Sequence, residues 1–215
     1  EDGYWIHAGN IGQARRQIGE MMNRLEQQHV QISNIGLDLE LPGSLVFSGR
    51  NPVMEYLRVR PFRFSQDDAH DQLSRFVEDI LNDGRFGVQT YEIPMLGDWR
   101  LTRQLLGIPK APEIEHPQYE RVGMVYTSVK PPLISPRTFI QRYSAGRKRT
   151  PALGIVSASN ENPGRDIHYS RLLIDTELQR DVKAALEGSP TKLFVFALNG
   201  PQVIERVRKA VQAVL

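Results

Sequence analysis

Five cations lie close together in the second half of the chain, within one stretch of 13 residues that holds no acidic side chain. They are Arg137, Arg142, Arg147, Lys148 and Arg149. Clustered cations repel one another and concentrate positive potential, and a bound anion relieves that repulsion. Nucleotide phosphates, nucleic acid and acidic protein surfaces all fit this chemistry. Tyr143 lies inside the stretch and offers a ring that stacks on a base.

Polar side chains follow two apolar segments that read as strands. The first, Ala152–Ser157, runs into a loop, and a helix is expected to begin near Asp166. The second, Lys192–Leu198, is followed by Asn199, and a helix is expected to begin shortly after it. Ligands of parallel α/β sheets bind beyond the carboxyl ends of the strands, where helix N-termini favour anions. The side chains expected to contact a ligand there are Ser157, Ser159, Asn160, Arg165 and Asn199.

These two features predict a binding domain for a nucleotide or another phosphorylated small ligand. Arg147, Lys148 and Arg149 are expected to anchor the anion, with Arg142 in support. We expect no cofactor and no metal site. An enzyme, such as a transferase or nucleosidase acting at the same strand-end loops, is an open alternative without a supporting motif, so we assign no catalytic residue. The interpretation assumes that the basic stretch and the strand-end loops converge.

A second candidate surface leads to an alternative function. In the predicted strand Glu55–Phe64, the side chains of Tyr56, Arg58, Arg60 and Phe62 share one face by strand alternation. Arginines and aromatic rings on an exposed sheet face are typical of single-stranded nucleic-acid binding. Pro61 favours a bulge or an edge position, which would instead leave the rings packed in the core.

Catalytic and metal-binding patterns are weak. Ser157 or Ser159 could be combined with His168 and Asp166, but nothing in the spacing fixes the geometry of a triad. Glu113, Glu115 and His116 could ligate a metal, yet they fall in a proline-containing connection without a rigid framework. The chain holds no Walker loop, GxGxxG, HExxH or GxSxG motif.

Charge is distributed unevenly along the chain. Residues 1–107 hold 11 basic and 15 acidic side chains, whereas residues 108–215 hold 16 basic and 10 acidic ones. We divide the chain at this point, since Pro109 and Pro112 mark a connection that is expected to be exposed. Opposite charges on the two parts suit head-to-tail contact, so a non-enzymatic assembly domain or a homodimer is a further alternative.

The periodicity of apolar residues predicts the elements that position these side chains. In the first part, a helix over 11–28 precedes β-like segments, and a second helix starts at Ser65 and ends at Gly84 before a strand over 86–95. A short helix over 100–106 follows. In the second part, the expected elements are a strand over 122–127, a short helix over 137–144, a strand over 152–157, a long helix over 166–186, a strand over 192–198 and a helix over 201–214.

The resulting fold class is α/β or α+β, with a mixed sheet flanked by helices. The first part, residues 1–107, is expected to be antiparallel, and the second, residues 108–215, to be built from βαβα-like units. The absence of cysteine excludes disulfides and thiolate metal sites. No apolar run is long enough for a membrane span, and no signal peptide is visible, so a cytoplasmic location is expected. Arginine outnumbers lysine 21 to 6, as a GC-rich bacterial genome would produce without any functional demand.

Overall fold

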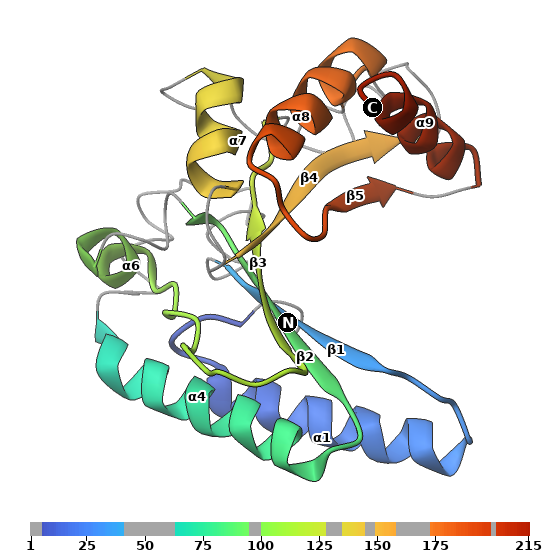
Figure 1. Cartoon of the computed structure of the whole chain (residues 1–215). Coiled ribbons are helices and arrows are strands. Elements are labelled where there is room, and N and C mark those ends of the chain that lie inside the picture. The colour runs from blue at the N-terminus through green and yellow to red at the C-terminus, as the bar shows by residue number, and fades with distance from the viewer. Residues whose placement is uncertain are drawn as a thin grey trace, which may run out of the picture. The chain divides into compact units, whose positions relative to one another are not determined.

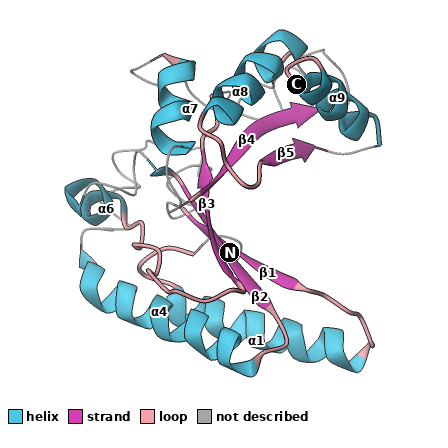
Figure 2. Cartoon of the chain, viewed as in Figure 1, coloured by secondary structure: helices cyan, strands magenta, loops and turns pink. Residues whose placement is uncertain are grey.

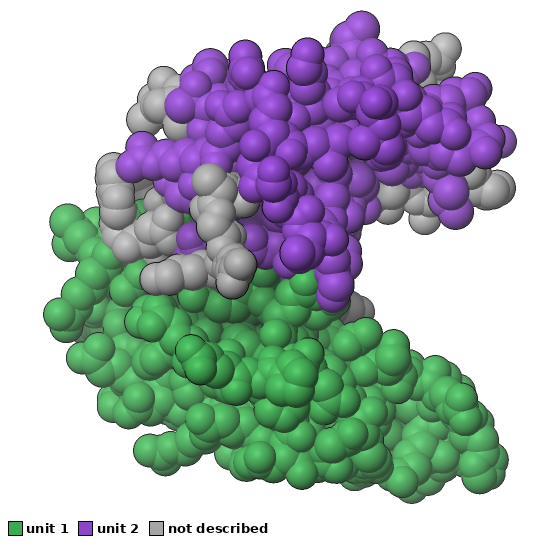
Figure 3. Space-filling view, in the orientation of Figure 1, with its two compact units in different colours: residues 1–121 green, residues 122–215 purple. Residues whose placement is uncertain are grey.

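The chain divides into two compact units, Glu1–Arg121 and Val122–Leu215 (Figure 3). The computed structural model describes residues 6–40, 63–94, 100–127, 135–144, 149–157, 173–198 and 201–215. Helices and strands alternate along the chain in both units (Figure 2). Most of the predicted strand Glu55–Phe64 lies outside the described residues, and its last two residues, which are described, are not part of a strand.

The first unit contains three helices and two strands in the part of it that the structure describes, together with the start of a third strand. Their order along the chain is α1 (Ile11–Gln27), β1 (Asn34–Leu39), α4 (Gln66–Asp83), β2 (Gly87–Glu92), α6 (Arg100–Leu106) and β3 (Tyr119–Met124). The predicted helices and the strand over 86–95 are all present, with ends that differ from the predictions by a few residues at most.

The second unit contains the end of β3 and five further elements. They are α7 (Pro136–Ser144), β4 (Thr150–Ser157), α8 (Asp175–Glu187), β5 (Phe194–Leu198) and α9 (Pro201–Gln212). The predicted helix over 166–186 is too long at its start, since Leu173 and Ile174 precede α8. Ile174 is extended, and its backbone N–H donates to the Glu177 carboxylate at 3.2 Å. This contact satisfies one of the free N–H groups at the start of the helix.

The five strands form one sheet in the order β1-β2-β3-β4-β5, and all of them are parallel. Ile35 pairs with Val88 and Leu37 with Thr90, so β1 and β2 run in the same direction. The antiparallel arrangement predicted for the first part is therefore wrong. Alternation of apolar and polar residues, as over 30–41, is typical of antiparallel strands with one face in solvent. It arises instead because β1 is a parallel strand with one apolar and one polar face.

Helices α1 and α4 lie side by side and cover the apolar face of β1 and β2 (Figure 1). Side chains at alternate positions of β1 point to this face and meet the periodic apolar stripe of α4. The buried side chains of this core include Ile35, Leu37, Leu39, Leu73, Phe76, Val77, Ile80 and Val88.

In the second unit, α7 and α8 pack against β4, and α9 packs against β5. The buried apolar stripe of α8 includes Leu178, Val182 and Ala185, whereas Ile174, which was also expected in it, is exposed and precedes the helix. Leu153 of β4 and Val203 of α9 are buried as well. Arg206 of α9 donates to the Asp175 carboxylate at 2.8 Å and to the Leu173 carbonyl at 3.2 Å. The last helix is thereby tied to the start of α8.

No helix in the described part of the chain is both long enough and apolar enough to cross a membrane.

Helix α4 has defined signals at both ends. The Ser65 hydroxyl accepts a hydrogen bond from the Asp68 backbone N–H at 3.2 Å, as predicted for an N-cap. At the other end Gly84 has φ +75°, a left-handed conformation in which glycine is far less strained than other residues. These signals fix where the helix starts and stops between Ser65 and β2.

Replacement of Ser65 by alanine should lower the free energy of unfolding by about 0.5–2 kcal/mol, because the Asp68 N–H loses its acceptor. Equilibrium urea unfolding measures this loss. Ser65→Asp keeps an acceptor at the cap and should retain most of the stability. Equal stability of the alanine variant and the unaltered protein would contradict the capping role.

Candidate functional site

The structure describes four of the residues predicted to bind a ligand. Arg142 and Tyr143 lie on α7, Arg149 immediately precedes β4, and Ser157 is the last residue of β4. The others lie outside the described residues, as does the aromatic and basic face proposed for nucleic acid. These are Arg147, Lys148, Ser159, Asn160, Arg165 and Asn199 for the ligand, and Tyr56, Arg58, Arg60 and Phe62 for nucleic acid.

Strand β4 separates the basic stretch from the polar strand end. Arg149 stands at the amino end of β4, and Ser157 closes its carboxyl end. A strand rises about 3.3 Å per residue, so these two residues are roughly 26 Å apart along the chain. Arg149 and Ser157 are therefore too far apart to contact one phosphate group.

Within the basic stretch, the described side chains differ in what they contact. Arg137 donates to the Glu187 carboxylate of α8 at 3.0 and 3.1 Å, so it forms an exposed ion pair with an acidic side chain. The Tyr143 ring packs edge-on against buried Phe139, with ring centroids 5.2 Å apart. Arg142 is exposed and makes no ion pair within the described ranges. Arg142 thus contributes positive potential in the segment before β4. The Tyr143 ring, in contrast, is used in part for packing against Phe139.

A buried polar cluster lies at the carboxyl end of β3 and was not predicted from the sequence. Asp181 of α8 is fully buried and accepts a hydrogen bond from the Thr127 hydroxyl. The guanidinium of Arg180 donates to Asp181 at 2.7 Å and to the Thr127 hydroxyl at 3.3 Å. Burial raises the pKa of Asp181, although the bonds from Thr127 and Arg180 oppose that rise.

The Arg180 side chain keeps an exposed fraction of 39% while Asp181 and Thr127 fix its orientation. An arginine has five N–H donors in a planar fork, and Asp181 and Thr127 occupy only some of them. Within the part of the chain that the structure describes, the Nη1 donors of Arg180 have no partner, and they lie beside Thr127, which follows the end of β3. The sequence signal for this cluster is a single acid, Asp181, inside the apolar stripe of α8.

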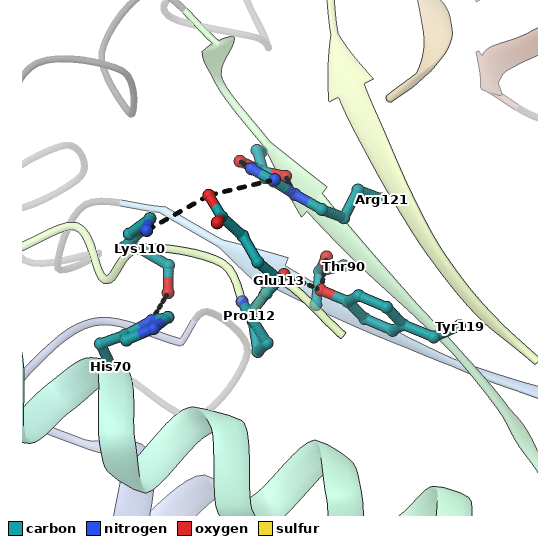
Figure 4. Close-up of polar contacts among 8 residues, drawn as sticks. His70, Thr90, Lys110, Pro112, Glu113, Tyr119 and Arg121 are labelled. Carbon is teal, nitrogen blue, oxygen red and sulfur yellow. Dashed lines mark hydrogen bonds and ion pairs between the residues drawn. The ribbon is translucent and has the colours of Figure 1, made fainter. Parts of the chain in front are cut away.

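A second polar network joins the connection after α6 to the sheet of the first unit (Figure 4). Arg121 of β3 donates to both carboxylate oxygens of Glu92 on β2, at 2.7 and 2.9 Å. Only 12% of the Arg121 side chain and 7% of the Glu92 side chain are exposed. The Glu113 carboxylate lies 4.0 Å from Arg121 and 3.2 Å from the Lys110 ammonium.

The connection over 108–120 was predicted to be exposed, and this prediction is wrong for its first part. Ile108, Ala111 and Pro112 are buried. The Tyr119 hydroxyl donates to the Pro112 carbonyl at 2.9 Å and lies 3.0 Å from the Thr90 hydroxyl, and burial raises the pKa of Tyr119 to about 12. His70 of α4 meets the Lys110 carbonyl at 3.2 Å. The prolines therefore shape a segment that packs against the sheet.

Breaking the Glu92–Arg121 pair should destabilise the protein strongly, since either change leaves one buried charge without this partner. Glu92→Leu and Arg121→Leu should each lower the free energy of unfolding by about 3–5 kcal/mol. The double variant should lose clearly less than the sum of the two, as urea unfolding of the full cycle would show. Additive losses would mean that the two charges do not act as a pair.

The polar face of β1 and β2 carries a carboxyl with unusual surroundings. Asp38 Oδ1 is buried and has no hydrogen-bond partner in the described part of the chain. Burial raises the pKa of Asp38 to about 7, and the Glu40 carboxylate adds to this rise. Tyr91, the register partner of Asp38, donates to the Gln89 side-chain oxygen, and Gln89 donates to Glu120, both at 3.0 Å. Shifted carboxyl groups are enriched at functional sites.

The stability contribution of Asp38 should depend on pH with a definite sign. Because its folded pKa is about 7 and its ordinary value is 3.8, the folded state is favoured below that ordinary value. This contribution is lost as the pH rises through 7. Asp38→Asn should therefore match the unaltered protein near pH 4 and exceed it by about 1–3 kcal/mol near pH 8.

Urea unfolding at the two pH values measures the difference between Asp38→Asn and the unaltered protein. Asp71→Asn is the matched control, because Asp71 is exposed on α4. A variant at position 38 that gains no stability near pH 8 would contradict the inferred ionisation of Asp38.

Other candidate constellations gain no support from the structure. Asp166 and His168 lie outside the described residues, so the triad stays untested. Among the side chains that the structure describes, no group of three or more His, Asp or Glu could hold a metal ion, and this includes Glu113, Glu115 and His116.

Comparisons with known proteins place the chain in no family. No family model matches the chain, and no curated protein matches it. Among solved structures, it is similar to a sugar phosphate isomerase/epimerase from Parabacteroides distasonis. The identity is 12% and the TM-score 0.34, over 89% of this chain and 79% of that chain.

Proposed function

We propose that the protein binds a small phosphorylated ligand, and that the second unit holds the phosphate at the carboxyl ends of its strands. The observation that carries this proposal is the Arg180 guanidinium, oriented at the end of β3 by Asp181 and Thr127. Asp181 and Thr127 take up the Nε and Nη2 donors of Arg180, and its Nη1 group is a charged donor of the kind that hydrogen-bonds phosphate oxygens.

The chain order adds further ligand groups at the same edge. Ser157 ends β4, and Ser159, Asn160 and Arg165 follow it in the sequence, while Asn199 follows β5. Hydroxyl, amide and guanidinium groups are the usual donors to phosphate oxygens. In this proposal these side chains complete the phosphate contacts that Arg180 begins.

Charge supports the same assignment. Residues 122–215 hold 14 lysines and arginines against 7 aspartates and glutamates, a net charge of +7. A field of this sign attracts anions over a distance of about a Debye length. Arg142, Arg147, Lys148 and Arg149 precede β4, so we assign them to steering of the ligand and not to direct contact with the same phosphate.

Replacement of Arg180 by glutamine should weaken binding of a phosphorylated probe about 10- to 100-fold, because hydrogen bonds to a charged group contribute roughly 1.5–3 kcal/mol each. AMP and ribose 5-phosphate serve as probes, and isothermal titration calorimetry at low and physiological salt measures their Kd. Circular dichroism and the Tm establish that the variant is folded.

Lys183→Gln is the matched control, since Lys183 is exposed on the same helix and its replacement removes the same charge. This control should leave the Kd of both probes within about twofold of the original value. Equal affinities of the Arg180 and Lys183 variants would contradict the proposed role of Arg180. Absence of binding by the unaltered protein would contradict the proposed function.

A further inference from the structure

Two aromatic rings meet across β4 in the second unit. Met124 of β3, Ala152 of β4 and Phe194 of β5 are register partners. Two residues further along each segment stand Tyr126, Gly154 and Phe196. The ring centroids of Tyr126 and Phe196 are 6.0 Å apart, with their planes tilted by 34°. The pair therefore spans the backbone of β4 at Gly154.

Gly154 leaves room for this arrangement. A Cβ atom at position 154 would lie 3.1 Å from the Phe196 Cβ and 3.1 Å from the Tyr126 Cε1, closer than most Cβ contacts. A side chain at this position would require the neighbouring rings to shift by a few tenths of an ångström. The glycine thus lets both rings approach the sheet from either side of β4.

Phe196 is unusual because 48% of it is exposed in spite of its size and its place in a strand. The register partners Met124, Ala152 and Phe194 form an apolar row that precedes the ring pair along the strands. Met124 and Ala152 of this row are buried. An exposed ring that continues an apolar row suits a flat, weakly hydrated partner.

The row also lies close to the proposed phosphate contacts. Gly154 precedes Ser157, the last residue of β4, by three residues, and Phe196 precedes Leu198, the last residue of β5, by two residues. Two or three residues of strand span about 7–10 Å. A ring stacked on Phe196 would thus be separated from the strand ends by a distance comparable to that between the base and the phosphate of a mononucleotide.

We propose that the Tyr126–Phe196 pair stacks on the base of a nucleotide, so that the phosphorylated ligand of this protein is a nucleotide and not a sugar phosphate. This inference rests on the proposed function and names the ligand class of that site. It assigns the phosphate to the strand ends and the base to the aromatic pair.

The test compares AMP with ribose 5-phosphate, which carries the same sugar and a phosphate but no base. Base stacking on an aromatic side chain corresponds to a preference of about 5- to 100-fold. Calorimetric titration of the unaltered protein should show this preference for AMP. Phe196→Ala should reduce the affinity for AMP to that for ribose 5-phosphate and leave the affinity for ribose 5-phosphate unchanged.

Ile204→Ala is the matched control, because Ile204 of α9 is another exposed apolar residue and its replacement removes apolar surface away from the aromatic pair. This variant should change neither affinity. Gly154→Ala displaces the rings without removing them and should weaken binding of AMP alone. Addition of AMP should also shift the NMR signals of the Phe196 ring protons upfield, a measurement that needs no variant.

Equal affinity of the unaltered protein for AMP and ribose 5-phosphate would overturn the stacking proposal while the phosphate site stands. The same holds if Phe196→Ala keeps the preference for AMP, or if the ring signals do not move when AMP binds. Absence of binding by both probes would overturn the proposed function and this inference together.

Discussion

Parallel pairing of the strands is the constraint on which the rest of the structure depends. Two consecutive strands that run in the same direction cannot be joined by a tight turn, so each connection has to cross over a face of the sheet. Helix α4 between β1 and β2, α7 between β3 and β4, and α8 between β4 and β5 meet this requirement. The same constraint collects the carboxyl ends of neighbouring strands at one edge, which is why Thr127 and Ser157 become relevant to binding.

Burial of charge is the second organising feature. Glu92 is matched by Arg121 between β2 and β3, and Asp181 is matched by Arg180 beside Thr127. In both cases an arginine contacts a carboxylate that the solvent barely reaches, so removal of the arginine takes away a charge that stabilises the ionised carboxylate in a medium of low dielectric constant. Asp38 differs from these two carboxylates, because burial and the neighbouring Glu40 raise its pKa and favour its protonated form.

Local signals made much of the fold predictable. The apolar spacing of α1 and α4, the Ser65 cap and the Gly84 end depend on neighbours within a few residues, and the structure confirms them. Strand direction depends on partners far along the chain, so the alternation in 30–41 was assigned to the wrong kind of sheet. The segment with Ile108 and Pro112 has the local composition of a surface connection. Its burial depends on contacts such as that of Tyr119 with the Pro112 carbonyl and Thr90, and no local sequence pattern predicts these contacts.

The candidate site was less predictable for a similar reason. The basic stretch and the polar strand ends are contiguous in sequence, but an eight-residue strand stands between Arg149 and Ser157. Arg149 and Ser157 are therefore close in the sequence but far apart in space. The role proposed for Arg180 could not be predicted, because an arginine on a helix has no distinctive spacing. Only its contacts with Thr127 and Asp181 distinguish it from other exposed arginines. The aromatic pair likewise depends on strand register that a single sequence does not contain.

The Glu92–Arg121 pair also restricts how this protein can evolve. Loss of either charge lowers stability by an amount comparable to the whole margin by which many domains remain folded. A lineage that changes one of the two residues must first have acquired stabilising substitutions elsewhere, or it must change the second residue almost at once. Two positions separated by 29 residues in the sequence are thus inherited as a unit. Descendants of this chain should carry both charges or neither.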